Sequence, residues 1–242
     1  MFAIQIADLV VEIHNRYSYV EELCREYAVR GKSTSFSVFA TEAEIDEELN
    51  ISDPRYPRAY AEATCLHRKI ARRLSEYDAF LLHSAAICCD GEGYAFAARS
   101  GVGKSTHVGL WLRNFGDRVQ VVNGDKPILR KDNGKFRVYG TPWNGKERLG
   151  DNISCEMKAL CFLERGETNH ISEICADEAL VRLFSQVYLP EDASASAATL
   201  DLIGEFIKKT HFYLLQCNMN DEAALVAYRG MNPINKENTN EN

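Results

Sequence analysis

The sequence lacks any apolar run that approaches the roughly 20 residues of a membrane-spanning helix. It also lacks an excess of basic residues, because 35 acidic residues outweigh 28 lysines and arginines and give a net charge of −7. This charge disfavours a nucleic acid or an anionic membrane held by bulk electrostatics, although a local basic pocket remains open. Asp8 and Glu12 lie where a signal peptide would be uncharged. We therefore expect a cytoplasmic protein with no membrane and no nucleic acid as partner.

Cysteine pairs of the C-x-x-C type are also missing, although the chain has eight cysteines. Most of these cysteines lie inside apolar runs, where a thiol behaves as a small hydrophobic side chain. The spacing therefore favours reduced, buried thiols over zinc ligands. Cys88 and Cys89 are adjacent at an expected hairpin tip and could oxidise, but nothing else in the sequence supports a redox role.

The 242 residues, 45% of them hydrophobic, are enough for one large domain with a smaller attached lobe. Short strands and helices without a glycine loop predict an N-terminal α+β lobe over residues 1–78. Strands and helices around a glycine loop predict a nucleotide-binding domain over residues 79–230. The polar tail of residues 231–242 has almost nothing to bury and is predicted to be mobile. No internal repeat is present.

Hydrophobic periodicity and turn residues predict the individual elements. In the lobe, Thr41 and Glu44 form a capping box at the start of a helix. The expected strands are 2–6, 9–13, 35–40, 79–89, 94–98, 118–122, 126–131, 135–140, 157–164, 169–174 and 211–216, and the expected helices are 18–29, 41–49, 60–77, 104–115, 177–188, 197–208 and 221–230.

A phosphate-binding loop is indicated by "AARSGVGKST", which follows an apolar strand and opens a helix. Gly101 and Gly103 let the backbone approach a phosphate, Lys104 supplies a cation, and Ser105 supplies a hydroxyl for Mg²⁺. Ala98 stands where the usual pattern has its first glycine. A plain glycine turn with an incidental lysine is the alternative, which the rarity of the pattern disfavours. The nucleotide-binding residues are expected to be Ser100, Gly101, Val102, Gly103, Lys104, Ser105 and Thr106.

His83 lies in the apolar run "FLLHSAA", where a lone histidine is usually a satisfied core residue. If the two strands pair about a tight turn at Asp90-Gly91, or about the longer "DGEG", His83 lies opposite residues 98–100. The ring would then lie beside the phosphate loop. Both interpretations of His83 remain open at this point.

Asp125 is the first acid after the apolar strand that ends at Asn123-Gly124. Nucleotide kinases need a second contact to the metal, and an acid at a strand end next to the loop usually provides it. Asp125 is therefore the candidate Mg²⁺ ligand beside Ser105, directly or through water. A plain Asn-Gly-Asp turn between two strands is the alternative.

The segment "GTPWNGKERLGDN" is too polar for a core and too distinctive for a linker. We expect it to cover the active site as a substrate loop, with Lys146 or Arg148 reaching the transferring phosphoryl group and Trp143 shaping a pocket. A surface loop with a packed tryptophan is the alternative.

These motifs together resemble the catalytic domain of HPr kinase/phosphorylase and its looser relatives, whose fold is shared with ATP-dependent phosphoenolpyruvate carboxykinase. The resemblance covers about residues 79–230 and depends mainly on S-G-x-G-K-S after a strand that carries a histidine. It implies a mixed α/β (α+β) fold, with a mixed sheet flanked by helices. It further implies that the phosphate loop binds ATP, that Ser105 and Asp125 hold Mg²⁺, and that His83 lies near the transferred phosphate, so that His83, Asp125 and Lys104 are the catalytic candidates.

Two departures from this family narrow the expected function. The family usually has two adjacent acids after the strand, and Gly124 replaces the first, which would act as the base. The glycine-rich arginine motif of HPr kinase is not recognisable, which disfavours the protein HPr as substrate. We expect a Mg-ATP-dependent kinase that phosphorylates a hydroxyl of a small molecule or a peptide serine. The alternative is a nucleotide-binding sensor or scaffold with weak catalysis. Carboxykinase chemistry is disfavoured because the chain is short and has no evident arginine-rich substrate site, and a homo-oligomer stays open.

Overall fold

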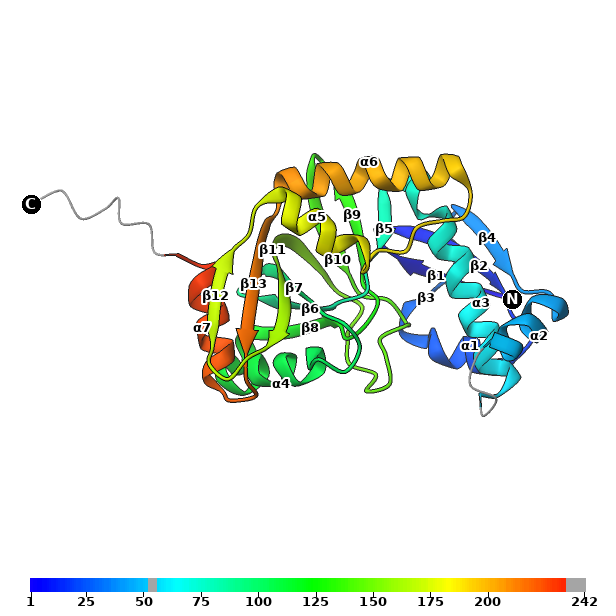
Figure 1. Cartoon of the computed structure of the whole chain (residues 1–242). Coiled ribbons are helices and arrows are strands. Elements are labelled where there is room, and N and C mark those ends of the chain that lie inside the picture. The colour runs from blue at the N-terminus through cyan, green and yellow to red at the C-terminus, as the bar shows by residue number, and fades with distance from the viewer. Residues whose placement is uncertain (52–55, 234–242) are drawn as a thin grey trace, which may run out of the picture.

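A computed structural model of the chain describes residues 1–51 and 56–233. The described strands form a four-stranded sheet near the N-terminus and a nine-stranded sheet that begins at Ala79 (Figure 1). The larger sheet curls and contains both parallel and antiparallel pairs, and helices flank it on both faces. The mixed α+β class predicted from the sequence is confirmed.

The N-terminal strands form a sheet in the order β3-β1-β2-β4, α3 packs against β4, and α1 and α2 pack against α3. The hairpin of β1 and β2 buries alternate apolar residues such as Val11 and Ile13, and the capping box holds, since Thr41 N donates to Glu44 Oε2 at 2.8 Å. The elements are β1 (Phe2–Ile6), β2 (Leu9–His14), α1 (Ser18–Leu23), η1 (Arg25–Tyr27), β3 (Ala28–Val29), β4 (Phe36–Phe39), α2 (Glu42–Ile51), α3 (Arg58–Arg73) and η2 (Leu74–Tyr77).

The prediction of a single helix over residues 18–29 is wrong for the second half of this range. The helix ends at Leu23, and Ala28 and Val29 form a short strand that pairs with β1. Between them, Cys24 and Tyr27 are buried in the core of the lobe. Pairing and burial in the tertiary structure outweigh helix propensity here, because propensity amounts to only a fraction of a kcal/mol per residue (about 0 to 0.7).

The larger sheet has the order β5-β9-β10-β11-β7-β6-β8, and β13 pairs with β11 on one side and β12 on the other. The long strand β11 pairs in parallel with both β7 and β13. Its elements are β5 (Ala79–Leu81), β6 (Ala85–Cys89), β7 (Glu92–Ala97), α4 (Lys104–Phe115), η3 (Gly116–Arg118), β8 (Val119–Asn123), β9 (Ile128–Asp132), β10 (Lys135–Tyr139), β11 (Ser154–Arg165), β12 (His170–Glu173), α5 (Ala176–Phe184), α6 (Ala193–Lys209), β13 (His211–Cys217) and α7 (Glu222–Met231).

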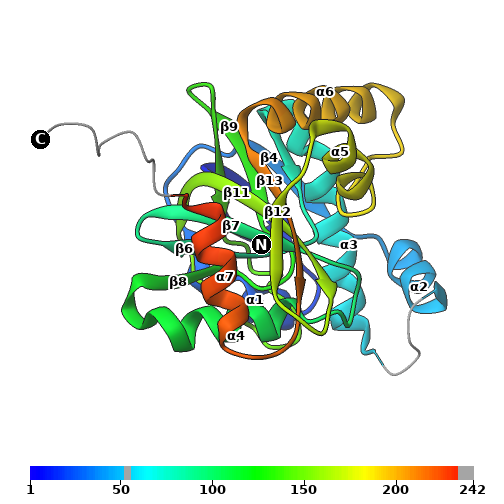
Figure 2. The ribbon, with the colours of Figure 1, turned by 60° about the vertical axis from the view of Figure 1, so that its left-hand side comes forward.

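Successive residues of β7 build the two cores of this sheet. Tyr94 and Phe96 pack toward α4 and α7, whereas Ala95 and Ala97 pack toward α5 and α6. Figure 2 shows α4 and α7 on one side of the strands and α5 and α6 on the other. This strand is buried on both faces and therefore appears in the sequence as a continuous apolar run.

The long apolar strand predicted over residues 79–89 is two strands in the structure. β5 pairs with β9 at one end of the sheet order, whereas β6 pairs with β7 and β8 near the other end. Leu82, His83 and Ser84 connect them, and the amides of these residues donate to Pro127 O, Gln186 O and Asp125 O at 3.1, 2.7 and 3.1 Å. Apolar periodicity could not reveal this crossing, because both halves are buried.

Of the two hairpin turns that the sequence left open, the structure has the tight one at Asp90-Gly91. Both residues have positive φ angles, 53° and 83°, as a two-residue hairpin turn requires. The ladder from Cys89 and Glu92 to Ala85 and Phe96 runs in register toward His83 and the glycine loop.

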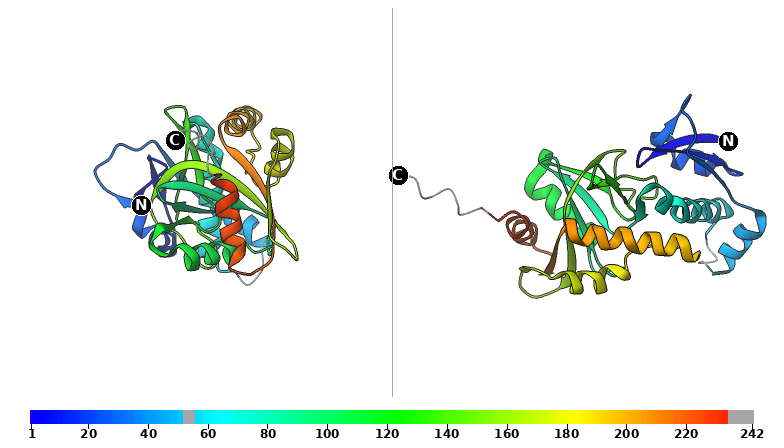
Figure 3. Two further views of the ribbon diagram at one scale, coloured as in Figure 1. Left: turned by 90° about the vertical axis from the view of Figure 1, so that its left-hand side faces the viewer. Right: turned by 90° about the horizontal axis from the view of Figure 1, so that it is seen from above.

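The N-terminal sheet and α3 lie at one end of the larger sheet (Figure 3). Leu81 and Ile128 of the larger sheet join the same apolar cluster as Leu66 of α3, so apolar packing is continuous across residue 79. The boundary between residues 78 and 79 stays a prediction.

The remaining predicted features have mixed outcomes. All eight cysteines are free thiols. None of the helices in the described ranges is long and apolar enough to cross a bilayer. Met231, in the predicted mobile tail, is the buried last residue of α7, and residues 234–242 lie outside the described part of the chain. β11 begins at Ser154 rather than at residue 157, and α5 ends at Phe184 rather than at residue 188.

Candidate nucleotide-binding site

The glycine loop connects β7 to α4 and adopts backbone angles that favour glycine. Gly101 and Gly103 have φ angles of 78° and 128°. The helix begins its own bonding with His107 N donating to Gly103 O at 2.9 Å, so the amides of residues 104–106 point out of its N-terminus. Arg165 Nη2 on β11 donates to Gly101 O at 2.7 Å and supports the loop. A helix N-terminus preceded by such a loop is suited to an anion.

Beside this loop, Lys104, His83 and Asp125 form a chain of polar contacts. Lys104 Nζ lies 3.3 Å from His83 Nε2 and donates to Ala98 O at 3.1 Å. His83 Nε2 lies 3.3 Å from Asp125 Oδ1, and Lys126 Nζ donates to Asp125 Oδ2 at 2.7 Å. The structure therefore brings together the three predicted catalytic candidates and adds Lys126.

Burial and neighbouring charges affect the pKa values of Lys104 and Asp125 in different ways. Burial lowers the pKa of Lys104, the positive charge of Lys126 lowers it further, and Asp125 opposes both. Burial alone would raise the pKa of Asp125, but hydrogen bonds from His83 and Lys126 outweigh it and hold the pKa well below its usual value. Asp125 therefore carries its negative charge throughout the physiological pH range.

Asn123, the last residue of β8, fixes the turn that presents Asp125. Its Oδ1 accepts from the backbone amides of Asp125 and Lys126 at 2.9 and 2.7 Å. Its Nδ2 donates to Thr141 Oγ1 at 3.0 Å and to Thr141 O at 3.1 Å. The side chain is fully buried with both polar atoms satisfied, so it is a rigid support for the turn. The Asn-Gly-Asp turn is therefore also the element that places Asp125 in the site.

Gly124 is tightly enclosed by the segment that was expected to be the substrate loop. A Cβ at this position would lie 2.9 Å from Asn144 O and 3.0 Å from Leu149 O. Gly124 N also donates to Leu149 O at 2.7 Å. The loop backbone therefore fills the space of the acid that the resemblance leads one to expect. A Gly124→Asp substitution would displace the loop, and it is not a clean test for a lost base.

The loop of residues 141–148 also contacts the N-terminal lobe. Trp143 Nε1 donates to Ala63 O on α3 at 3.1 Å. The Trp143 ring stacks on His67 with centroids 4.7 Å apart and an interplanar angle of 25°. Lys146 and Arg148 are exposed and line the cavity described next. The tryptophan is therefore half-buried between two parts of the molecule rather than packed on a surface loop alone.

A cavity of about 860 Å³ joins the glycine loop, the Asp125 turn, the 141–148 loop and the N-terminal lobe. Such a volume is typical of small-molecule sites. Of the predicted site residues, Val102 alone does not line it. Its lining residues are Tyr19, Leu23, Tyr60, Ala63, Thr64, His67, His83, Ser100, Gly101, Gly103, Lys104, Ser105, Thr106, Gly124, Asp125, Lys126, Pro142, Trp143, Asn144, Gly145, Lys146, Glu147 and Arg148.

The oxygen atoms of Ser105 and Asp125 suit Mg²⁺, because both residues line this cavity and Asp125 stays ionised. Magnesium in nucleotide sites usually takes one or two protein oxygens together with phosphate oxygens and water. Within residues 1–51 and 56–233, no group of three or more His, Cys, Asp and Glu side chains is placed to hold a metal ion. The residues therefore fit a nucleotide-bound magnesium rather than a site made by protein ligands alone.

Sequence reasoning missed several residues of the site. Lys126 and Asn123 are adjacent to predicted residues, and the Asn-Gly-Asp-Lys order was a usable signal for both. Arg165 and the α3 residues Tyr60 and His67 had no such signal, since only the tertiary structure brings them to the loop.

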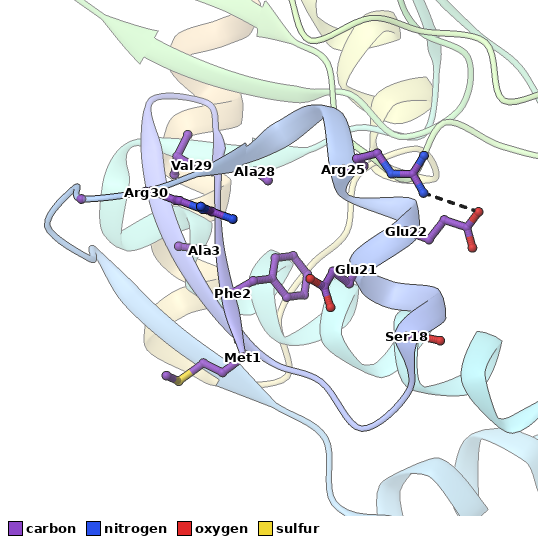
Figure 4. Close-up of a pocket in the computed structure, with 11 residues that line it drawn as sticks. Met1, Phe2, Ala3, Ser18, Glu21, Glu22, Arg25, Ala28, Val29 and Arg30 are labelled. Atoms are coloured by element: carbon purple, nitrogen blue, oxygen red, sulfur yellow. Dashed lines mark ion pairs between the residues drawn. The ribbon is translucent and has the colours of Figure 1, made fainter.

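A second cavity of about 880 Å³ lies in the N-terminal lobe and shares no lining residue with the first (Figure 4). Its charged side chains, including the pair Arg25 and Glu22 at 3.8 Å, are exposed. An exposed ion pair of this kind contributes little. The chemistry discussed below therefore concerns the cavity at the glycine loop.

Comparisons with known proteins give only distant likenesses in structure and none in sequence. No protein-family model matches the chain, and a search of curated proteins finds no match. A solved structure described as the Hpr(Ser) kinase/phosphatase from Coxiella burnetii is similar, with 10% sequence identity and a TM-score of 0.34, and the match covers 61% of this chain and 91% of that chain.

Proposed function

We propose that the protein is a Mg-ATP-dependent phosphotransferase that transfers the terminal phosphoryl group to a hydroxyl of a small molecule or a peptide serine. The observation that carries this proposal is the chain of contacts from Lys104 through His83 to Asp125 at the N-terminus of α4. The resemblance of the glycine-loop motif to HPr kinase/phosphorylase supports it. ATP and the acceptor are the partners that this function requires.

The loop residues bind and orient the triphosphate in this proposal. Amides of residues 104–106 donate to phosphate oxygens, and Lys104 exchanges its contacts with Ala98 O and His83 for the outer phosphates. The lowered pKa of Lys104 reflects a cation that burial has removed from water, which strengthens its attraction to a phosphate. Bound Mg²⁺ supplies neutralisation of charge on the β- and γ-phosphates.

The acceptor oxygen bonds to the γ-phosphorus as the bond to the β-phosphate oxygen breaks, and ADP leaves. The acceptor proton must pass to a base near Asp125. The carboxylate itself is a weak base, because its pKa is held low by His83 and Lys126. Asp125 therefore suits the metal. His83 suits the proton when its own proton is on Nδ1, because Nε2 is then free to exchange its contacts with Lys104 and Asp125 for the acceptor hydroxyl. Lys126, and Lys146 or Arg148 on the loop, provide further positive charge in the cavity.

Labelled ATP, Mg²⁺ and panels of hydroxyl compounds and serine peptides would test this function with the purified protein. We expect labelled product with the wild type and almost none with Lys104→Ala. Binding of ATP without transfer to any acceptor, together with unchanged behaviour of the variant, would contradict the proposal.

A nucleotide-binding sensor is the second candidate, and the packing of the 141–148 loop favours it. A Cβ at Gly145 would lie 3.0 Å from Asp125 Cβ, and Gly124 is enclosed by the same loop. A ligand at Asp125 therefore acts directly on the loop. In a sensor, Mg-ATP alters hydrogen exchange of this loop without turnover; in a kinase, turnover accompanies the change.

A further inference from the structure

The cavity at the glycine loop has a second end that the nucleotide does not require. Here the walls come from the N-terminal lobe and the substrate loop, and we name the set Tyr19, Tyr60, Thr64, His67 and Trp143 the aromatic end. The rings of Tyr19 and Tyr60 lie 6.4 Å apart, and Trp143 stacks on His67. None of these side chains carries a charge at neutral pH.

His67 is the most informative residue of the aromatic end. Its side chain is only 7% exposed, and its Nε2 has no hydrogen-bond partner within the described ranges. Burial lowers its pKa to about 3, so the ring is neutral at physiological pH. A buried polar atom without a partner costs about 1–3 kcal/mol, and a ligand that reaches Nε2 after a small side-chain movement recovers that energy.

The aromatic end lies on the acceptor side of the phosphate site. The charges that act on His67 come from Lys126, Asp125 and Arg68, and Asp125 also acts on Tyr60. Lys104, which would hold the outer phosphates, is linked to Asp125 Oδ1 through His83. The loop that carries Trp143 reaches Asp125 from another element, since a Cβ at Gly145 would lie 3.0 Å from Asp125 Cβ. Asp125 therefore adjoins both Lys104 and the loop of the aromatic end. A molecule on the aromatic end would present its hydroxyl next to Asp125.

We infer that the aromatic end is the acceptor subsite, and that it binds an uncharged small molecule with a ring or apolar body, a hydroxyl and a group that hydrogen-bonds to His67 Nε2. This inference rests on the proposed phosphotransferase function for its meaning, but binding itself does not require transfer. Aromatic faces and one neutral nitrogen bind such a body well, whereas none of the five side chains of the aromatic end would form an ion pair with a charged acceptor.

Saturation-transfer NMR tests the subsite without any turnover. The full chain with Mg²⁺ and ADP is mixed in turn with benzyl alcohol, uridine and methyl glucopyranoside, with benzoate and benzylammonium as charged counterparts, and with a serine peptide. We expect saturation of at least one uncharged probe and much weaker saturation of the charged ones. The variant Thr64→Trp fills the aromatic end and should abolish the signal, whereas Leu200→Trp places the same ring on the exposed face of α6 and should not.

A second variant keeps the test valid if Thr64→Trp fails to fold. His67→Phe retains a ring to stack on Trp143 but removes Nε2, and it should weaken probe binding about tenfold. Lys104→Ala should lose ATP binding and keep probe binding. The kinase proposal and the subsite can therefore fail independently, the first by unchanged ATP binding in this variant and the second by absent probe binding in the wild type.

The inference is overturned if no uncharged probe binds, if binding survives both substitutions in the aromatic end, or if charged probes bind as well as uncharged ones. Binding of serine peptides alone would also overturn it, and would assign the aromatic end to a peptide instead.

Discussion

The two ends of the cavity satisfy their polar groups in opposite ways. We call the end of the cavity at the glycine loop the phosphate end. There, Lys104 contacts His83, His83 contacts Asp125, and Asp125 contacts Lys126. At the aromatic end, His67 Nε2 has no partner in the described part of the chain. The charged end is thus held together without ligand by its own ion pairs, whereas the neutral end retains an unpaired atom. Under the proposed function, the phosphate end would exchange existing contacts on binding, whereas the aromatic end would gain a new one.

The largest expected effect tests the phosphate end. Lys104→Ala removes the cation at the helix N-terminus, and phosphoryl transfer should fall by about 10²–10³-fold, as for the loss of one donor at a transition state. Transfer from labelled ATP measures this. Lys135→Ala is the control, because Lys135 is exposed and pairs with Glu156 away from the cavity. Equal losses in the two variants would refute a specific role.

Asp125→Asn should have the next largest effect, about a hundredfold on transfer, because it removes the charge that is suited to the metal. The Mg²⁺ concentration for half-maximal rate should rise at the same time. A magnesium titration of the rate measures both quantities. The control Asp201→Asn changes an exposed acid on α6. An unchanged magnesium requirement would show that Asp125 does not bind the metal. The contrast between a charged end and a neutral end of the cavity would then lose support.

Buried histidines should make stability depend on pH. Burial lowers the pKa of His67 and of His107 to about 3, below their value in an unfolded chain. Below about pH 6.5 the unfolded state therefore binds more protons than the folded state. As the pH decreases below this value, the free energy of unfolding should decrease by up to about 1.4 kcal/mol per pH unit for each histidine. This contribution is fully present above pH 6.5.

Urea unfolding between pH 7 and pH 5 measures this slope in the wild type, in His67→Gln and in His107→Gln. Each substitution should reduce the slope, whereas His170→Gln, at an exposed position, should leave it unchanged. A bound uncharged ligand should separate the two histidines, because it would stabilise the neutral form of His67 and not that of His107, which is a buried residue of α4 that packs against Phe96. Equal effects of the ligand on both histidines would contradict the subsite.

The smallest expected effect concerns the contact between α3 and the 141–148 loop at the aromatic end. Trp143→Phe keeps a ring against His67 but removes the hydrogen bond from Nε1 to Ala63 O. Loss of one such bond should lower the free energy of unfolding by about 1 kcal/mol. Urea unfolding measures it at pH 7. No measurable loss would show that α3 and the 141–148 loop are held together by other contacts.

Local sequence patterns predicted some parts of this molecule well. The helix predicted over residues 104–115 has those bounds in the structure, and the hairpin turn at Asp90-Gly91 sets the register that brings His83 toward the glycine loop. These features depend on residues a few positions apart, whose backbone angles and hydrogen bonds the residue types themselves favour. The crossing between β5 and β6 was not predictable in this way, since His83 N bonds to Gln186 O far along the chain.

By itself, the sequence determined the phosphate end: glycines where φ is positive, a lysine and a serine at a helix N-terminus, and an acid directly after a strand. The tertiary structure alone decided the aromatic end, because Trp143 meets Ala63 across 80 residues of chain and His67 becomes buried beside that contact. Local patterns specify backbone geometry, but which side chains from distant segments share one cavity depends on how the N-terminal lobe packs on the larger sheet.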